Sequence, residues 1–357
     1  MAVASRGVVL EERGVSPVFG TLELAEPGPG EVLVRMAAAG LCHTDISAVR
    51  DARVTPLVLG HEGAGIVEQV GKHVADLTPG TPVLLCWKPP CGTCPACRRG
   101  AVELCASPLD VPVDRVQWQG HAVTRLLGTG CFSEFVLVPA RAAIPLPDGD
   151  RLAEASLIGC AVATGLGAAL RTADVRPGSS AVVFGAGGVG LNVVLGCALA
   201  HASVIVAVDP SEERRALASH RGATHVATPE EAQDAVAEAT GGRGADYAFE
   251  VVGVPAVMQE ALGTLGRGGT LVLIGAAARD AQLAFPPRAF MSRQQSITGC
   301  IYGSIRPYAD LPLFVSWWSE GKIPLGDLID ETVPLEALPE AFADGPRAGV
   351  RTAVSFL

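Results

Sequence analysis

The sequence predicts an α/β protein whose second half contains a doubly wound parallel sheet. From about Ser179, the run SAVVFGAGGVGLNVVLGCALA reads as a short buried strand, a glycine-rich turn and a helix rich in Ala, Leu and Val. Strand and helix patterns then alternate up to about residue 301, and such alternation produces a parallel sheet with helices on both faces. With 357 residues, the chain is long enough for a second domain with its own core.

The glycine-rich turn has the spacing G-x-G-x-x-G, with Gly185, Gly187 and Gly190. In a dinucleotide-binding fold the first glycine permits the tight turn, the second lets the backbone approach the pyrophosphate, and the third lets helix and strand pack closely. The next strand, VIVAVDP, ends in Asp209, where a carboxylate can bind the adenosine ribose and would repel a 2′-phosphate. These residues favour NAD over NADP, although Asp209 could also be a turn residue at a strand end.

The rest of the predicted sheet follows in order along the chain. ADYAFEVVG reads as a strand, residues 255–265 as a helix, and GTLVLIG and SITGCIYG as further strands. The sheet would therefore extend from about residue 180 to residue 301 and form a nicotinamide-dinucleotide domain.

Four cysteines lie close together upstream of this domain. They occur in the run CGTCPACRRGAVELC, as Cys91, Cys94, Cys97 and Cys105. Thiolates this close in sequence can surround one tetrahedral Zn²⁺. A disulfide framework is the alternative, but the chain lacks the other marks of a secreted protein. A site closed by four thiolates has no open position for a substrate, so we expect a structural zinc lobe here and the chemistry elsewhere.

Composition excludes some classes of function. The formal net charge is −10 and no Lys/Arg cluster is long enough to follow a phosphate backbone, so we expect no nucleic-acid partner. The N-terminal residues lack a signal-peptide pattern, and Gly, Asp or Pro interrupts the longest apolar stretches, so we expect no membrane span. Ten cysteines in such a chain indicate a reducing compartment, and we expect a cytoplasmic protein.

A second candidate metal site consists of residues scattered along the chain. Cys42 lies in LCHTD, His61 in LGHEGAGIVEQVG and Cys160 in LIGCAVATG. Two cysteines and one histidine are a catalytic zinc set that leaves a fourth position for water or a substrate oxygen. The residues alone do not show that these side chains converge, and each could instead be an ordinary core residue.

Several motifs together identify a family. The signature G-H-E-x-x-G-x5-G-x-x-V is present as Gly60, His61, Glu62, Gly65, Gly71 and Val74. The C-H-T-D run, the cysteine quartet, GTGCFSEF (128–135), GCAVATG, GAGGVG and RTAVSF (351–356) accompany it and cover essentially the whole chain. In kind and in order these motifs resemble the zinc-containing alcohol dehydrogenases of the medium-chain dehydrogenase/reductase superfamily.

The resemblance implies a GroES-like, β-rich catalytic domain built from residues 1–161 and 302–357, with the structural zinc lobe at 91–105. The NAD-binding Rossmann domain, residues 162–301, is inserted between the two parts. The same resemblance implies two zinc ions per chain, one catalytic and one structural, and NAD as the cofactor. It also implies a homodimer that pairs through the edge of the cofactor sheet.

The resemblance assigns catalytic residues position by position. Cys42, His61 and Cys160 resemble the catalytic zinc ligands. Glu62 resembles the nearby carboxylate that approaches the metal when the water leaves. Asp45 resembles the acid that orients the ligand histidine.

A proton relay is implied at the start of the C-H-T-D segment. Thr44 resembles the hydroxyl that accepts the alcohol proton. Many relatives have a histidine five residues after the first zinc cysteine, where the relay reaches solvent, but this chain has Ser47. A serine hydroxyl does not hold a proton near neutral pH as imidazole does, so we expect the relay to end on a water or a ribose hydroxyl.

The resemblance also assigns the cofactor site and the pocket. His43 and Arg351 would contact the pyrophosphate, and Arg214 would flank the adenosine ribose. The expected cofactor-binding residues are His43, Thr164, Gly185, Gly187, Gly188, Val189, Gly190, Asp209, Arg214, Ile274 and Arg351. Trp87, Phe132 and Ile301 would line the substrate pocket, although the aromatic rings could instead fill the core.

The expected reaction is the interconversion of an alcohol and its aldehyde by hydride transfer to or from NAD. Aromatic walls favour a primary, apolar substrate, benzylic or allylic. The first alternative is a dehydrogenase of thiol–formaldehyde adducts, whose carboxylates would need cations such as Lys88, Arg115 or Arg125. The second is a non-catalytic NAD-binding sensor, which the presence of Cys42, His61, Glu62 and Cys160 disfavours.

Overall fold

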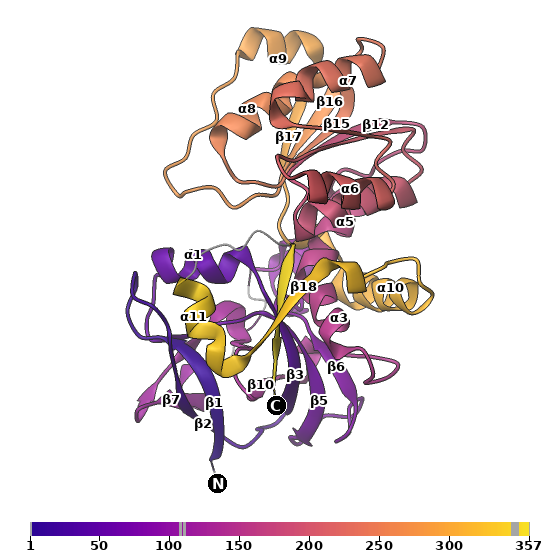
Figure 1. The fold of residues 1–357 in the computed structure, drawn as a ribbon. Helices are drawn as coiled ribbons and strands as arrows, with labels where there is room; N and C mark the ends of the chain where they lie inside the picture. The colour runs from indigo at the N-terminus through magenta and orange to yellow at the C-terminus, as the bar shows by residue number, and fades with distance from the viewer. Residues whose placement is uncertain (1, 107–108, 110–111, 344–349, 357) are drawn as a thin grey trace. The chain divides into compact units, whose positions relative to one another are not determined.

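Two units divide the chain in the computed structural model, which describes residues 2–106, 109, 112–343 and 350–356 (Figure 1). The first unit comprises Met1–Cys160 and Arg306–Leu357, and the second comprises Ala161–Ile305. The sequence placed the second boundary four residues earlier, at 301/302. The difference arises because residues 302–304 pack on the second unit, where a Cβ on Gly303 would lie 2.7 Å from the Cα of Gly167.

The first unit is built on two sheets of mainly antiparallel strands. One sheet has the order β8 (His121–Ala122), β7 (Val116–Trp118), β2 (Val18–Leu24), β1 (Val3–Leu10), β4 (Leu57–Val58) and β9 (Thr124–Arg125). The other has the order β11 (Ala143–Pro145), β6 (Pro82–Leu85), β5 (Glu62–Val70), β3 (Glu31–Leu41), β19 (Arg351–Ser355) and β18 (Ile329–Pro334), with β10 (Phe135–Pro139) also paired to β3.

Helices and short turns connect these strands. The α-helices are α1 (His43–Asp51), α2 (Pro95–Arg98), α3 (Leu152–Leu157), α10 (Pro307–Ser319) and α11 (Leu338–Ala343). The 3₁₀ turns are Val102–Leu104, Val113–Arg115, Leu126–Gly128, Ala140–Ala142, Gly326–Leu328 and Leu335–Ala337.

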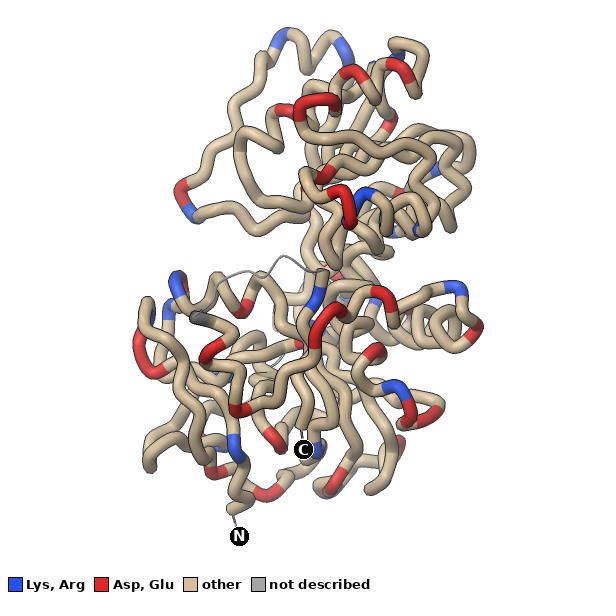
Figure 2. The backbone as a smooth tube through the Cα atoms, viewed as in Figure 1, with Lys and Arg blue, Asp and Glu red and all other residues tan. Residues whose placement is uncertain are grey.

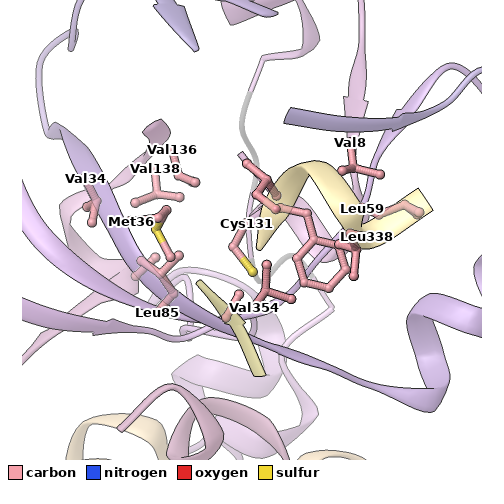
Figure 3. Packing of buried hydrophobic residues seen from close by; sticks show 14 of the residues in the cluster. Val8, Val34, Met36, Leu59, Leu85, Cys131, Val136, Val138, Leu338 and Val354 are labelled. Carbon is pink, nitrogen blue, oxygen red and sulfur yellow. The ribbon is translucent and has the colours of Figure 1, made fainter. Parts of the chain in front are cut away.

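The last strand of the chain completes the core of the first unit. β19 pairs antiparallel with β3 and parallel with β18. Figure 3 shows core side chains that come from distant parts of the sequence: Val8, Val34, Met36, Leu59, Leu85, Cys131, Val136, Val138, Leu338 and Val354. Because burial of such side chains is the main favourable term in folding, the two ends of the chain depend on each other.

The second unit contains the predicted doubly wound sheet. Its strands have the order β14 (His225–Ala227), β13 (Val204–Val208), β12 (Ser180–Phe184), β15 (Ala245–Glu250), β16 (Leu265–Leu273) and β17 (Ser296–Gly299), and all the pairs are parallel. Strand β12 is buried at every residue, as expected for a strand covered on both faces. The strand order reverses at β12, so the switch point lies between β12 and β15, where such sheets bind ligands.

Helices cover this sheet in the expected alternation. They are α4 (Ala163–Gly167), α5 (Gly188–Leu199), α6 (Glu212–His220), α7 (Ala232–Ala239), α8 (Pro255–Gly263) and α9 (Pro287–Arg293), with 3₁₀ turns at Pro229–Glu231 and Tyr302–Ser304. The strand predicted in SITGCIYG ends at Gly299. It does not extend to residue 303, because Tyr302–Ser304 all have positive φ.

One long helix crosses the boundary between the units along the chain. It runs over Leu152–Thr172 and includes two π-helical segments, Ile158–Val162 and Ala168–Thr172. Among the described residues, it is the helix long and apolar enough to cross a membrane by length and composition, which the sequence analysis did not expect. Most of it is buried inside the protein, and core helices pass the same test.

Charged residues are distributed over both units. Figure 2 shows Lys and Arg interspersed with Asp and Glu along the backbone of each unit. The expectation that the chain has no nucleic-acid partner stays a prediction from its formal net charge of −10.

The glycine-rich turn provides a stability prediction. A Cβ on Gly190 would collide with the carbonyl oxygen of Gly185, whereas a Cβ on Gly187 would have no atom within 4 Å. We expect Gly190→Ala to destabilise the second unit by about 1–3 kcal/mol, because the backbone would have to move. Gly187→Ala should cost less than about 1 kcal/mol. Denaturant unfolding followed by circular dichroism measures both, and equal stabilities would contradict this packing argument.

Candidate active site

Four potential metal ligands from three distant segments meet inside the first unit. The ligand atoms of Cys42, His61, Glu62 and Cys160 all lie within 4.8 Å of one another, and all four residues are buried. Cys160 Sγ is 3.4 Å from His61 Nε2. Sulfur and nitrogen ligands of one tetrahedral zinc are separated by roughly 3.6 Å, so the donor set fits this metal.

A buried carboxylate fixes two of these ligands. Asp45 accepts hydrogen bonds from the backbone N–H of Cys42 and of Gly60, both at 3.0 Å, and lies 3.3 Å from His61 Nδ1. It belongs to the first turn of α1, where Cys42 is the N-cap residue and a negative charge is favourable. The contact with Nδ1 leaves Nε2 of His61 to face the cluster, as second partners of ligand histidines commonly do.

Cys160 lies in the first π-helical segment of the long helix. π-helical segments are rare in proteins overall, but those that occur are often found at functional sites. The neighbouring Gly159 lets this helix approach the sheet, since a Cβ there would lie 2.6 Å from the carbonyl oxygen of Leu85. Helix and sheet together therefore place the Cys160 thiol beside His61.

Glu62 forms an ion pair inside the cluster. Its Oε1 lies 3.3 Å from Nη2 of Arg351, and both side chains are almost fully buried. Arg351 also donates from Nη1 to the carbonyl oxygen of Leu41 at 3.0 Å. Gly40 provides the space, because a Cβ at this position would collide with Oε2 of Glu62. The predicted contact of Arg351 with the pyrophosphate stays a prediction.

Burial and charge set the protonation of the cluster. A hydrogen bond with Cys160 holds the pKa of Cys42 well below its ordinary value. Burial opposes a charged His61, but Asp45 and Cys42 outweigh it and raise the pKa of this histidine. Burial also raises the pKa of Glu62 to about 7. A metal that binds here would displace protons, so its affinity would fall as the pH falls.

The cysteine quartet forms a second cluster in the same unit. Its four sulfur atoms lie within 4.8 Å of one another, with 4.0 Å between Cys91 and Cys97 and 3.9 Å between Cys94 and Cys105. A tetrahedron with zinc–sulfur bonds of 2.3 Å has edges of roughly 3.8 Å, so the four thiols fit one zinc ion.

Backbone N–H groups donate to three of these four sulfurs, whereas burial raises the pKa of the fourth, Cys97, to about 11. Cys94 N–H donates to Cys91 Sγ at 3.3 Å, Cys97 N–H to Cys94 Sγ at 3.5 Å, and Cys91 N–H to Cys105 Sγ at 3.4 Å. Hydrogen bonds from Thr93 and Cys94 lower the pKa of Cys91 to about 5. We refer to residues 91–105 as the zinc lobe.

The predicted phosphate-binding turn lies at the switch point of the second unit. Gly185 has φ of 96°, which favours glycine, and Gly187 is the N-cap of α5. Gly188, Val189 and Gly190 form the first turn of α5, whose N-terminal N–H groups can bind a phosphate. Beside this turn, Glu250 at the end of β15 accepts hydrogen bonds from Val252 and Gly253 at 2.8 and 2.7 Å.

Asp209 has a structural role that the sequence analysis weighed as an alternative. Its carboxylate accepts hydrogen bonds from the backbone N–H of Ala186 at 2.8 Å and of Ser211 at 2.9 Å, and Asp209 is buried. It thus ties the glycine-rich turn to the end of β13. Arg214 Nη1 lies 4.0 Å from Oδ2 of Asp209. The contact of Arg214 with the adenosine ribose stays a prediction.

The other predicted site residues divide between the units. Thr164 on α4 and Ile274 after β16 are half-buried in the second unit, while His43 is exposed on α1 in the first. Trp87 is only 8% exposed and Ile301 is 57% exposed. Phe132 is completely buried in the core of the first unit, with its ring 6.3 Å from that of Phe342. This burial is consistent with the core role that the sequence left open for Phe132, and its pocket role stays a prediction.

Sequence reasoning missed one residue that holds the site in place. Asp330 accepts hydrogen bonds from the backbone N–H of Val350 and of Arg351, the latter at 2.8 Å. It fixes the start of β19 and thereby the guanidinium beside Glu62. Only the pairing of β18 with β19 would have revealed this role, because nothing in the local sequence marks Asp330.

Comparisons with known proteins identify the family of this chain. Residues 28–148 match the family model described as alcohol dehydrogenase GroES-like domain, and residues 188–319 match that described as zinc-binding dehydrogenase. The S-(hydroxymethyl)glutathione dehydrogenase of Paracoccus denitrificans is 32% identical, over 95% of this chain and 96% of that protein. The chain belongs to the zinc-containing alcohol dehydrogenase family.

Two further members of this alcohol dehydrogenase family are similar over nearly their whole length. The NDMA-dependent alcohol dehydrogenase of Amycolatopsis methanolica is 35% identical over 95% of both chains. The structure of benzyl alcohol dehydrogenase from Acinetobacter calcoaceticus superposes with a TM-score of 0.89 and 29% identity, over 99% of this chain and 100% of that one. The chain is therefore an oxidoreductase with the GroES-like and Rossmann-type architecture of this family.

Asp45 provides a test of the buried carboxylate. Asp45→Asn would place an amide donor opposite some of the N–H groups that Asp45 now accepts from. We expect zinc affinity at the Cys42 cluster to fall about 10–100-fold. Competition with a chromogenic chelator measures this affinity. Asp51→Asn is the matched control, because Asp51 lies on the same helix in an exposed ion pair with Arg50. Equal affinities for the two variants would contradict the role of Asp45.

Proposed function

We propose that this chain catalyses the NAD-dependent interconversion of a primary, apolar alcohol, benzylic or allylic, and its aldehyde. The observation that carries the proposal is the buried set of Cys42, His61 and Cys160, beside which Glu62 is engaged by Arg351. Three ligands of this kind, with the adjacent carboxylate held by a guanidinium, leave one coordination position for the substrate.

The residues of the chain divide the work of this reaction. When bound, the zinc would polarise the alcohol oxygen and the nicotinamide would accept the hydride. Asp45 keeps the His61 ring oriented, and Arg351 holds Glu62 in an ion pair. Thr44, two residues after Cys42 at the start of α1, supplies a hydroxyl that takes the alcohol proton while it passes its own proton to a water or a ribose hydroxyl.

Two relatives bear on the substrate in different ways. The benzyl alcohol dehydrogenase supports an aromatic alcohol. The S-(hydroxymethyl)glutathione dehydrogenase supports the adduct alternative, which requires cations to bind carboxylates. The three cations considered for that task have other partners: Arg115 pairs with Glu31 at 2.7 Å, buried Arg125 donates to the carbonyl of Leu137, and Lys88 to that of Glu103. These contacts favour the apolar alcohol.

The decisive experiment follows NADH formation with a panel of primary, benzylic, allylic and secondary alcohols. The panel is repeated with formaldehyde plus low-molecular-weight thiols, and with NDMA as an electron acceptor, because of the name of the Amycolatopsis relative. Turnover of apolar alcohols would support the proposal. Activity restricted to formaldehyde with a thiol would replace it with the adduct reaction, and no turnover by zinc-loaded protein in any arm would contradict catalysis.

The cofactor preference is a separate prediction. Asp209 places a buried carboxylate at the end of β13, and its charge would repel a 2′-phosphate. We expect kcat/KM for NAD to exceed that for NADP by about 100-fold or more, because like charges brought together cost several kcal/mol. Steady-state kinetics with each cofactor measures the ratio. A ratio near one would show that Arg214 compensates for Asp209.

The proton relay can be tested within α1. We expect Thr44→Val to lower kcat/KM about 10²–10⁴-fold, because the variant loses the proton acceptor. Ser47→Ala, one helical turn further on, should cost little. The pH–rate profile should also lack a histidine-like inflection from position 47. A large loss in Ser47→Ala would show that the relay passes through this serine.

A further inference from the structure

The zinc lobe is joined to the rest of the first unit by a lysine with no part in the proposed reaction. Lys88 Nζ donates a hydrogen bond to the carbonyl oxygen of Glu103. Glu103 belongs to the 3₁₀ turn Val102–Leu104, which leads directly into Cys105. Lys88 therefore contacts the arm of the lobe that carries its fourth ligand.

The segment that carries Lys88 is anchored in a sheet. It follows β6, and the N–H of Cys86 donates to the carbonyl oxygen of Ala142 at 2.7 Å. The next residue, Trp87, is also buried. Lys88 is half-buried, so its ammonium group extends from a fixed backbone toward the lobe. A tether of this kind restrains the arm 102–105 independently of the metal.

Charge gives Lys88 a second effect on the lobe. Four thiolates around one Zn²⁺ leave a net charge of −2. Burial lowers the pKa of Lys88 below its ordinary value, and the nearby charges of Cys105, Glu103 and Cys97 oppose this shift without reversing it. Arg98 and Arg99 are also nearby in the sequence, but both are exposed, so solvent screens their charges more strongly.

We propose that Lys88 is the internal counter-ion of the zinc lobe: it neutralises part of the thiolate charge, tethers the arm to Cys105 and slows release of the metal. This role is independent of the proposed reaction. Its consequence is kinetic, because a ligand must leave the metal before a chelator or thiol reagent can remove it. A lobe without Lys88 would open more readily at Cys105.

The test measures zinc released to a chromogenic chelator by the whole, zinc-loaded protein. Lys88→Met removes charge and hydrogen bond, Lys88→Gln keeps a donor without the charge, and Lys88→Arg keeps both. We expect release about tenfold faster in Lys88→Met, the size of effect that one partly buried charge produces. Lys88→Gln should also release zinc faster than the wild type, and Lys88→Arg should match the wild type.

Two controls assign the effect to the lobe. Lys322→Met removes an exposed lysine paired with Glu320 at 2.7 Å and should release zinc at the wild-type rate. The series is repeated in a His61→Ala background, which removes a ligand of the Cys42 cluster, so that the remaining zinc belongs to the lobe.

Each outcome decides the proposal. Wild-type release from Lys88→Met would overturn it, and wild-type release from Lys88→Gln would overturn the counter-ion role. If the Met and Gln variants fail to fold while Lys88→Arg and Lys322→Met fold with zinc, the charge is required for assembly of the lobe, which supports the proposal. Because the readout is zinc and not turnover, failure here leaves the proposed reaction untouched.

Discussion

The carboxylate of Asp45 is the constraint on which the active site depends. It gathers the N–H groups of Cys42 and Gly60 and the ring of His61 around one buried charge. A buried carboxylate without such donors would be costly, so the start of α1 and the segment before β5 are held together. Both metal ligands thereby acquire fixed positions before any metal arrives. Arg351 balances the charge of the other buried carboxylate, Glu62.

The two metal clusters bring four ligands together over different separations in the sequence. The zinc lobe takes all its ligands from fifteen consecutive residues, 91–105, and its own N–H groups stabilise the thiolates. The catalytic cluster takes its ligands from the N-cap of α1, from the start of β5 with the residue before it, and from a π-helical segment, so it exists only when sheet and helix are packed. The ligands of the zinc lobe stay together because they are close in sequence. The ligands of the catalytic cluster stay together because the surrounding core holds their segments in place.

This difference explains what the sequence could predict. The strand–turn–helix at Gly185 and the cysteine quartet are local patterns, and both were readable from residue types and spacing. Convergence of Cys42, His61 and Cys160 required the family resemblance, because the residues alone leave core packing as an alternative. The burial of Phe132 and the contacts of Asp330 with the start of β19 depend on strand pairing and packing, which no short pattern encodes. Arg351 was found by resemblance, but its ion pair with Glu62 depends on the register of β19 against β3.

The position of β19 has a consequence for the order of events during synthesis. The sheet around β3 stays incomplete until Arg351–Ser355 have left the ribosome, since β19 lies between β3 and β18. Domains fold as units as they emerge, so the whole cofactor sheet can form during this interval. The zinc lobe can close on its metal as soon as residues 91–105 have been made. The catalytic cluster lies beside a sheet that stays incomplete until β19 has been made. The zinc lobe can therefore close on its metal before β19 is made, whereas Arg351 can pair with Glu62 only after β19 has joined the sheet.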